Sequence, residues 1–194
     1  MSLMALTFVT MKTVVKNVGT SGSLSLTTPL SIDEVEFRVS RFTKDKSGVF
    51  LLAYKDARAD MNRLDAVVGN GFWQKRYEVI KGNLYCSVGI FNKELEQWVW
   101  KDDVGTESNT ESQKGEASDA FKRACFNWGI GRELYSYPDI YIKLNPDESR
   151  MGNNVQFAIK KWRWASQFDD NGTLTYLGCN DGKNMRYEFG KFRK

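Results

Sequence analysis

Four carboxylates in the second half of the chain have types and spacing that could support metal chemistry. Asp102 and Asp103 are adjacent, and Glu116 and Asp119 follow further along the chain. Carboxylate oxygens are preferred ligands of Mg²⁺, and a bound Mg²⁺ could activate water for phosphodiester hydrolysis. In the interpretation that we favour, Asp102 and Asp103 instead end a strand, and Asp119 pairs with a basic side chain of a neighbouring chain.

Other common catalytic chemistries lack the residues that they need. The chain contains no histidine, which removes the usual general base near neutral pH and every Ser-His-Asp or Cys-His arrangement. Cys86, Cys125 and Cys179 lie far apart and form no zinc-binding pattern. The segments 129–133 and 178–184 both fail the GxxxxGK[ST] spacing of a phosphate-binding loop. We therefore expect no nucleotide hydrolysis, no metal site and no cofactor.

A different chemistry, the binding of phosphate groups, is indicated by the segment from Gln113 to Trp128. Small and apolar residues recur there at about 100° per residue, as on the buried face of a helix. Lys122 and Arg123 flank the remaining surface, and Phe126 lies opposite the apolar face. Two cations beside an exposed ring could bind phosphates and stack a base. For Phe126 the alternative is a subunit or intramolecular contact. The residues of the apolar face are Ala117, Ala120, Phe121, Ala124, Cys125 and Trp128.

Three β-like runs precede this helix, and short polar segments separate them. The connections KGN and NKELE are too short for anything but direct pairing of neighbouring strands. The sequence therefore predicts an antiparallel meander followed by the helix. The three runs are 72–80, 84–91 and 97–102.

Two further strands and an earlier helix are expected upstream of the meander. Alternation of apolar and polar residues predicts one strand over 34–42, and an apolar run predicts another over 49–54. Asp56 can cap the start of the helix and Gly69 can end it. The apolar face expected for this helix consists of Ala57, Met61, Leu64 and Val68.

The two ends of the chain differ in composition from this middle part. Residues 1–31 end in a stretch rich in Ser, Thr and Gly, so we expect a flexible N-terminal arm before a core of residues 32–145. The runs VQFAIKKWRWASQF, TLTYLG and MRYEFG predict that residues 146–194 form a β-rich extension packed on the core. The KKWRW segment, Lys160–Trp164, is expected to be a two-faced strand with its tryptophans inward, and a direct nucleic-acid contact is the alternative.

Bulk composition is that of a globular protein with one well-packed core. Lys and Arg outnumber Asp and Glu by 28 to 24, and a formal charge of +4 does not by itself indicate a nucleic-acid partner. The first apolar run is too short for a secretory signal, and no stretch reaches the roughly 20 apolar residues of a membrane span. With its scattered cysteines, the sequence predicts a soluble protein of a reducing compartment.

Three segments occur in the order and spacing of a known protein family. They are AYKDARADMNRLDAVVGNGFW, KGNLYCSVGIF and KGEASDAFKRACFNWGIGRELY. From about Val35 to Tyr141 the chain resembles the Rad52/Rad22 family of single-strand annealing proteins, and it looks like a phage or prophage member. The most specific element is the helix motif DAFKRA, followed by Trp128 and Gly129.

The resemblance implies an α+β fold with an antiparallel β-β-β-α core and an earlier helix. It further implies that copies pack side by side into a ring, or a filament, with single-stranded DNA in a positively charged groove around the outside. A single-strand binding protein or an exonuclease would be a compatible further partner. The implied location is the cytoplasm of a bacterial host, without membrane contact.

Candidate DNA-binding residues follow from the same resemblance, position by position. Lys122 and Arg123 match the adjacent basic pair that holds the DNA backbone, and Arg58 lies near a basic position on the first helix of the family. A third basic position on the motif helix falls on Phe126, where this chain departs from its relatives. A lysine of the strand hairpin falls on Asn83, for which the nearby lysine could substitute. The expected DNA-binding set is Lys122, Arg123, Arg58, Lys81, Lys114 and Phe126.

Annealing leaves Watson–Crick edges free, so a protein that promotes it should hold phosphates and leave the bases exposed. We therefore expect a protein without enzymatic activity that binds single-stranded DNA and anneals complementary strands, without ATP, in recombination and DNA repair. Two alternatives stay open: a metal-dependent nuclease, and a ring that coats single strands without pairing them.

Overall fold

A computed structural model describes residues 24–106 and 112–193, with side chains described for 24–106 and 115–193. By contacts the chain divides into two units. We call residues 24–30 and 55–132 the helix–meander unit, and residues 31–54 and 133–193 the two-sheet unit. One boundary of this division, between residues 30 and 31, lies next to the expected end of the N-terminal arm, and the expected boundary near residue 145 stays a prediction. Among the described helices, none has the length and apolar character needed to cross a membrane.

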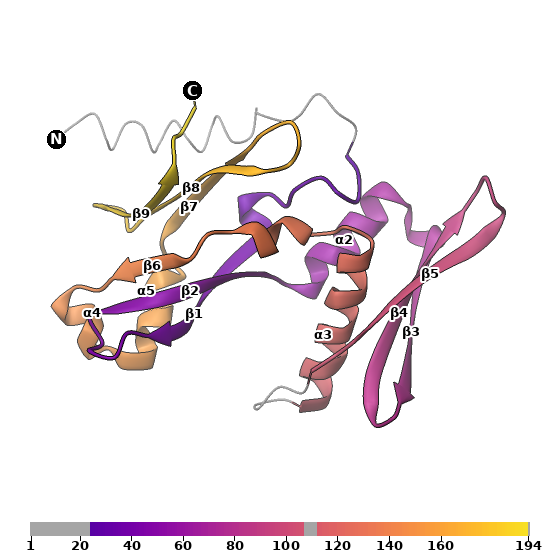
Figure 1. Cartoon of the computed structure of the whole chain (residues 1–194), viewed down its shortest axis with the longest axis horizontal. Helices are drawn as coiled ribbons and strands as arrows, with labels where there is room; N and C mark the ends of the chain where they lie inside the picture. Colours follow the sequence, from indigo (N-terminus) through magenta and orange to yellow (C-terminus); the bar gives the residue numbers. More distant parts are fainter. Residues whose placement is uncertain (1–23, 107–111, 194) are drawn as a thin grey trace. The chain divides into compact units, whose positions relative to one another are not determined.

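The helix–meander unit has the β-β-β-α order that was expected, with a helix before it (Figure 1). Its sheet has the order β3-β4-β5, and both strand pairs are antiparallel. Lys81 and Gly82 connect the first two strands with positive φ angles of 51° and 82°, as a two-residue hairpin turn requires. The elements are α2 (Ala57–Val67), β3 (Trp73–Ile80), β4 (Asn83–Asn92), β5 (Gln97–Val104) and α3 (Ser112–Asn127).

Helix α3 packs against one face of this sheet (Figure 1). The apolar face predicted for it is confirmed at its centre, where Phe121 is 1% exposed and its ring stacks on that of Trp73 with centroids 6.2 Å apart. Because side chains alternate along a strand, Trp73 and Lys75 lie on the same face of the sheet. The residues of this core with no exposed surface are Cys86, Val88, Ala120, Ala124 and Cys125.

The two-sheet unit contains two further three-stranded sheets and two short helices. One sheet has the order β1-β2-β6 and the other β7-β8-β9, and the pairs β2–β6, β7–β8 and β8–β9 are antiparallel. Across the described residues the protein is therefore α+β with antiparallel sheets, as predicted. The elements are β1 (Val35–Phe42), β2 (Gly48–Lys55), β6 (Ile140–Lys143), α4 (Pro146–Arg150), α5 (Val155–Ile159), β7 (Arg163–Phe168), β8 (Leu174–Asn180) and β9 (Met185–Gly190).

The strand expected through the VQFAIKKWRWASQF run is wrong for its first half. Residues 155–159 form helix α5, and strand β7 begins only at Arg163. The reason is the spacing of the buried side chains, because Val155 and Ile159 are both buried and lie four residues apart, as on one face of a helix. Gln156 fixes this helix to β1 by accepting a hydrogen bond from Val39 N at 2.6 Å. Trp162 consequently precedes the strand.

Only the last part of the expected N-terminal arm lies among the described residues, since residues 1–23 fall outside them. Residues 24–30 belong to the helix–meander unit, where Leu30 is 1% exposed. Arg63 of α2 donates hydrogen bonds to the carbonyl oxygens of Ser25 and Thr28. The buried Arg63 guanidinium thus holds this stretch against α2, and the buried side chain of Leu30 anchors its end.

Candidate nucleic-acid interface

The two adjacent basic residues of α3 point toward different neighbours. Arg123 faces strand β5, where its Nη2 atom lies 3.2 Å from Asp103 Oδ1 and its Nε atom donates to the same oxygen at 3.3 Å. Lys122 faces α2 and acts electrostatically on Asp56 and Asp60. The sequence placed these cations on opposite flanks of the helix, and the structure agrees.

On the α2 side, Arg58 and Lys122 act on one carboxylate. Asp56 caps the start of α2 by accepting from Arg58 N, as predicted, and Arg58 Nε lies 2.9 Å from its Oδ1 atom. The hydrogen bonds from Arg58, with a smaller contribution from Lys122, hold the pKa of Asp56 below its usual value. The Arg58 side chain is 80% exposed. Two predicted site residues therefore act on the carboxylate at the N-terminal end of α2, where the helix dipole adds positive potential.

On the β5 side, Arg123 is 39% exposed and keeps part of its guanidinium in contact with solvent. Asp103 engages the edge formed by Nε and Nη2, and no acceptor for the Nη1 donors is found among the described residues, so they can serve another one. A guanidinium held along one edge presents the other edge in a fixed orientation. This geometry suits the recognition of a phosphate oxygen.

Phe126 is not the exposed ring that its helix position indicated. Its side chain is partly buried, and Lys55 Nζ lies 4.3 Å from the centre of the ring. The intramolecular contact, one of the two alternatives for this residue, is the one observed. A stacking role for Phe126 stays a prediction.

Beneath this surface lies a buried ion pair that the sequence did not predict. Lys55 and Asp60 are 2% and 0% exposed, they contact each other directly, and Lys55 Nζ also donates to Ile130 O at 2.6 Å. Burial raises the pKa of Asp60 to about 6, against the opposing effect of Lys55.

The buried face expected for helix α2 was correct only at Leu64, because the other residues that α2 buries are Ala59, Asp60 and Arg63. The one available signal was the spacing of Asp60 four residues before Leu64.

Further cations of the unit, also missed, stabilise α3 itself. Lys101 Nζ donates to Asn127 O at 2.8 Å, and Arg132 Nη2 donates to Phe126 O at 2.8 Å. Basic groups at the last carbonyls of a helix satisfy acceptors that have no partner within it. Lys75 lies 4.4 Å from the ring centre of Phe121. Strand alternation could have indicated Lys75, because it shares a face with Trp73.

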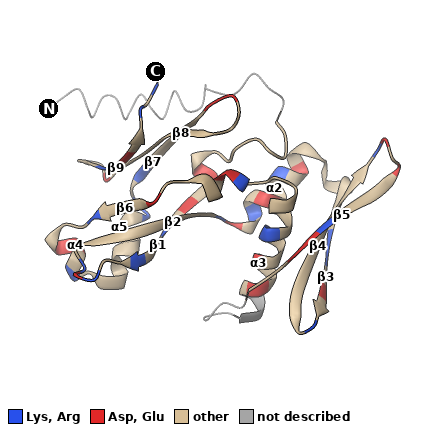
Figure 2. Ribbon diagram, viewed as in Figure 1, with Lys and Arg blue, Asp and Glu red and all other residues tan. Residues whose placement is uncertain are grey.

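The remaining predicted site residues lie apart from this cluster. Lys81 occupies the exposed turn between β3 and β4. Lys114 belongs to the first turn of α3, but its side chain lies outside those described. Figure 2 shows basic residues on both helices of the unit and along its strands.

Three of the four candidate metal-binding carboxylates, those of Asp103, Glu116 and Asp119, are engaged in protein contacts. Asp103 binds Arg123, and Asp119 accepts from the backbone N and the hydroxyl of Thr106 at 3.1 and 2.9 Å. Glu116 accepts from Leu84 N at 3.4 Å. In the part of the chain that the structure describes, no group of three or more acidic, cysteine or histidine side chains could hold a metal ion.

Residues 22–148 match the sequence profile of the Rad52/22 family double-strand break repair proteins. The chain belongs to the Rad52/22 family. The match contains every predicted site residue, and the resemblance drawn from the DAFKRA helix is therefore confirmed. It ends within α4, so the β7-β8-β9 sheet lies beyond the part that defines the Rad52/22 family.

Two known single-stranded DNA-binding proteins are similar in sequence to this chain. The single-stranded DNA-binding protein DdrA of Deinococcus radiodurans is 31% identical over 139 residues, which cover 71% of this chain and 64% of DdrA. DdrA of Deinococcus deserti is 34% identical over 122 residues, which cover 62% of this chain and 59% of that protein. The chain thus spans less than two thirds of the length of either relative.

Proposed function

We propose that this chain binds single-stranded DNA and anneals complementary strands in recombination and DNA repair, without ATP and without cutting the DNA. The main support for this proposal is the Rad52/22 match over residues 22–148, which includes helix α3 with Lys122 and Arg123. Both relatives are named as single-stranded DNA-binding proteins, which supports the same ligand for this chain.

The proposed mechanism uses the two flanks of α3 to hold successive phosphates. Lys122 and Arg58 would bind one phosphate near Asp56. Without DNA, both cations interact with the Asp56 carboxylate. Arg123, oriented by Asp103, would bind the next through its free guanidinium edge. Phosphate contacts carry no sequence preference and leave the base edges free for a complementary strand.

We further propose that copies of the chain assemble into a ring or filament through the edge of the meander. Strand β3 is an edge strand of its sheet, and it exposes Tyr77, Val79 and Ile80 by 41%, 67% and 41%. Edge strands have unpaired backbone groups, and exposed apolar residues along them favour pairing with another chain. A multimer would place many copies of the α3 cations along one DNA strand.

The direct test is an annealing assay with two complementary oligonucleotides in buffer without ATP. The account predicts that the protein accelerates duplex formation and that added Mg²⁺ leaves the strand lengths unchanged on a denaturing gel. Shortened strands would support the nuclease alternative. Tight binding without faster pairing would support a coating protein instead.

A further inference from the structure

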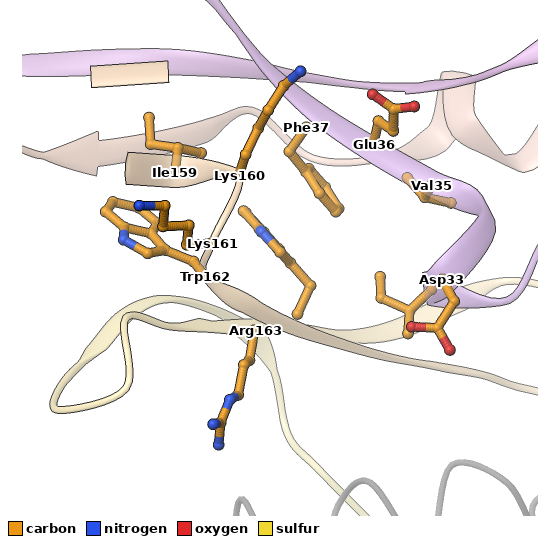
Figure 3. A pocket seen from close by; sticks show the side chains of 11 residues that line it. Asp33, Val35, Glu36, Phe37, Ile159, Lys160, Lys161, Trp162 and Arg163 are labelled. Atoms are coloured by element: carbon orange, nitrogen blue, oxygen red, sulfur yellow. The ribbon is translucent and has the colours of Figure 1, made fainter. Parts of the chain in front are cut away.

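A pocket of about 530 Å³ lies within the two-sheet unit, and one of its walls falls beyond the family match (Figure 3). One wall is formed by residues 32, 33 and 35–37, just before and at the start of β1, and the other by residues 159–164 from the end of α5 into β7. A volume in this range is typical of pockets that hold small molecules or parts of larger ligands. The wall of residues 159–164 contains the KKWRW segment.

Two aromatic rings form a rigid part of this pocket. Phe37 and Trp164 stack in parallel, with ring centroids 3.6 Å apart and an angle of 9° between the planes. Phe37 is only 6% exposed, so its ring supports the wall of the pocket and offers little surface to a ligand. The pair fixes the β1 wall against the β7 wall.

Trp162 is a third aromatic residue, partly exposed and held from one side. The Arg186 guanidinium carbon lies 4.4 Å from the centre of the Trp162 ring. Arg186 is only 7% exposed, and it donates to Glu148 at 2.7 Å and to Asp181 at 2.9 Å. Its hydrogen bond to Glu148 raises the pKa of Arg186 and lowers that of the Glu148 carboxyl, so the pair stays ionised. A ring held this firmly loses little freedom when a ligand stacks on it.

Three exposed cations surround the aromatic residues. Lys160, Lys161 and Arg163 are exposed, and no ion pair found among the described residues involves any of them. The side chains of Lys160 and Arg163 extend in opposite directions from their segment (Figure 3). The carboxylates of the pocket, Asp33 and Glu36, belong to the opposite wall. Apart from the buried Ile159, the α5–β7 wall consists of basic and aromatic residues.

We infer that this pocket is a second contact for single-stranded DNA, separate from the α3 surface. Interleaved cations and aromatic rings bind single strands without sequence preference, because every base can stack and every nucleotide carries a phosphate. Trp162 would stack a base, and Lys160, Lys161 and Arg163 would bind the flanking phosphates. This inference rests on the proposed function for its ligand, but it uses none of the α3 residues.

The test compares the full chain with a variant that carries Lys160→Gln, Lys161→Gln and Arg163→Gln. The matched control carries Lys44→Gln, Lys46→Gln and Lys183→Gln, which remove the same charge from exposed positions of the same unit outside the pocket. We expect the pocket variant to bind a long oligothymidylate about tenfold more weakly than the control. The slope of log K against log salt should become less steep by about 2, because each phosphate contact on a single strand contributes roughly 0.7.

Photocrosslinking with oligonucleotides that contain iodouracil provides a second measurement on the unaltered pocket. We expect a crosslink at Trp162, both in the wild type and, at higher protein concentration, in the variant Lys122→Ala/Arg123→Ala. That pattern would separate the pocket from the α3 site. Affinity and salt slope equal to those of the control, with no crosslink in residues 160–164, would overturn the inference while leaving the α3 proposal intact. An acidic peptide that binds the pocket while the pocket variant keeps full DNA affinity would overturn it as well.

Discussion

At the scale of single residues, the helix–meander unit depends on charges buried where apolar side chains were expected. Asp60 and Lys55 are almost completely buried beneath the ring of Phe126. Hydrophobic periodicity cannot indicate such a pair, because charged residues are expected on the solvent-exposed face of a helix or strand. The partly buried position of Phe126 has the same origin, since Lys55, the last residue of β2, packs against its ring.

Replacing Lys55 alone should be costly, whereas replacing the whole pair should not. Lys55→Met leaves the Asp60 carboxylate buried without its direct partner, and we expect a loss of about 3 kcal/mol in the free energy of unfolding at pH 7.5. The double variant Lys55→Met/Asp60→Leu should recover most of this loss, because neither charge is then buried. Urea denaturation measures both. Equal stability of the single and the double variant would show that the pair is not coupled.

The pH dependence of stability should carry the signature of Asp60. Burial raises its pKa from 3.8 to about 6 in the folded state, so the native protein binds a proton there before the unfolded chain does. The contribution to stability is therefore complete below pH 3.8 and is lost as the pH rises through about 6. Relative to Asp60→Asn, the wild type should gain up to about 3 kcal/mol between pH 7 and pH 4. A stability difference that does not change with pH would contradict this assignment.

At the scale of elements, local sequence signals were sufficient to predict strand pairing where the two paired strands follow each other in the sequence. The meander was predictable because short connections permit only direct antiparallel pairing, and the Lys81–Gly82 turn fixes its register. Helix α3 was predictable from its apolar stripe. Helix α5 was missed because five residues with two buried side chains give too short a pattern to separate helix from strand.

The exposed edge of the meander is expected to control assembly. Val79→Lys together with Ile80→Lys places two charges along β3, which should disfavour pairing with another chain. We expect the mass measured by light scattering to fall to that of a monomer or a small oligomer. Leu52→Lys, at a 47% exposed position of β2 in the other unit, provides the control. Assemblies of unchanged mass in the β3 variant would place the interface elsewhere.

At the scale of the whole molecule, family membership was predictable from ordered segments rather than from bulk charge. A formal charge of +4 distributed over two units says little about a ligand. The order of the segments around DAFKRA indicated the family that the profile match confirms. The pairing of Arg123 with Asp103, and the electrostatic effect of Lys122 on Asp56, could not be predicted, because the two residues of each pair are distant in sequence.

Whether α3 holds the DNA is decided by the affinity of Lys122→Ala/Arg123→Ala for single-stranded DNA over a range of salt concentrations. Lys44→Ala/Lys46→Ala removes the same charge from an exposed turn of the other unit and serves as the control. The account predicts that the α3 variant keeps the melting temperature of the wild type but binds at least about tenfold more weakly. Its salt slope should be less steep by about 1.4, as expected for the loss of two phosphate contacts. Binding with the affinity and salt slope of the control would show that α3 does not hold the DNA.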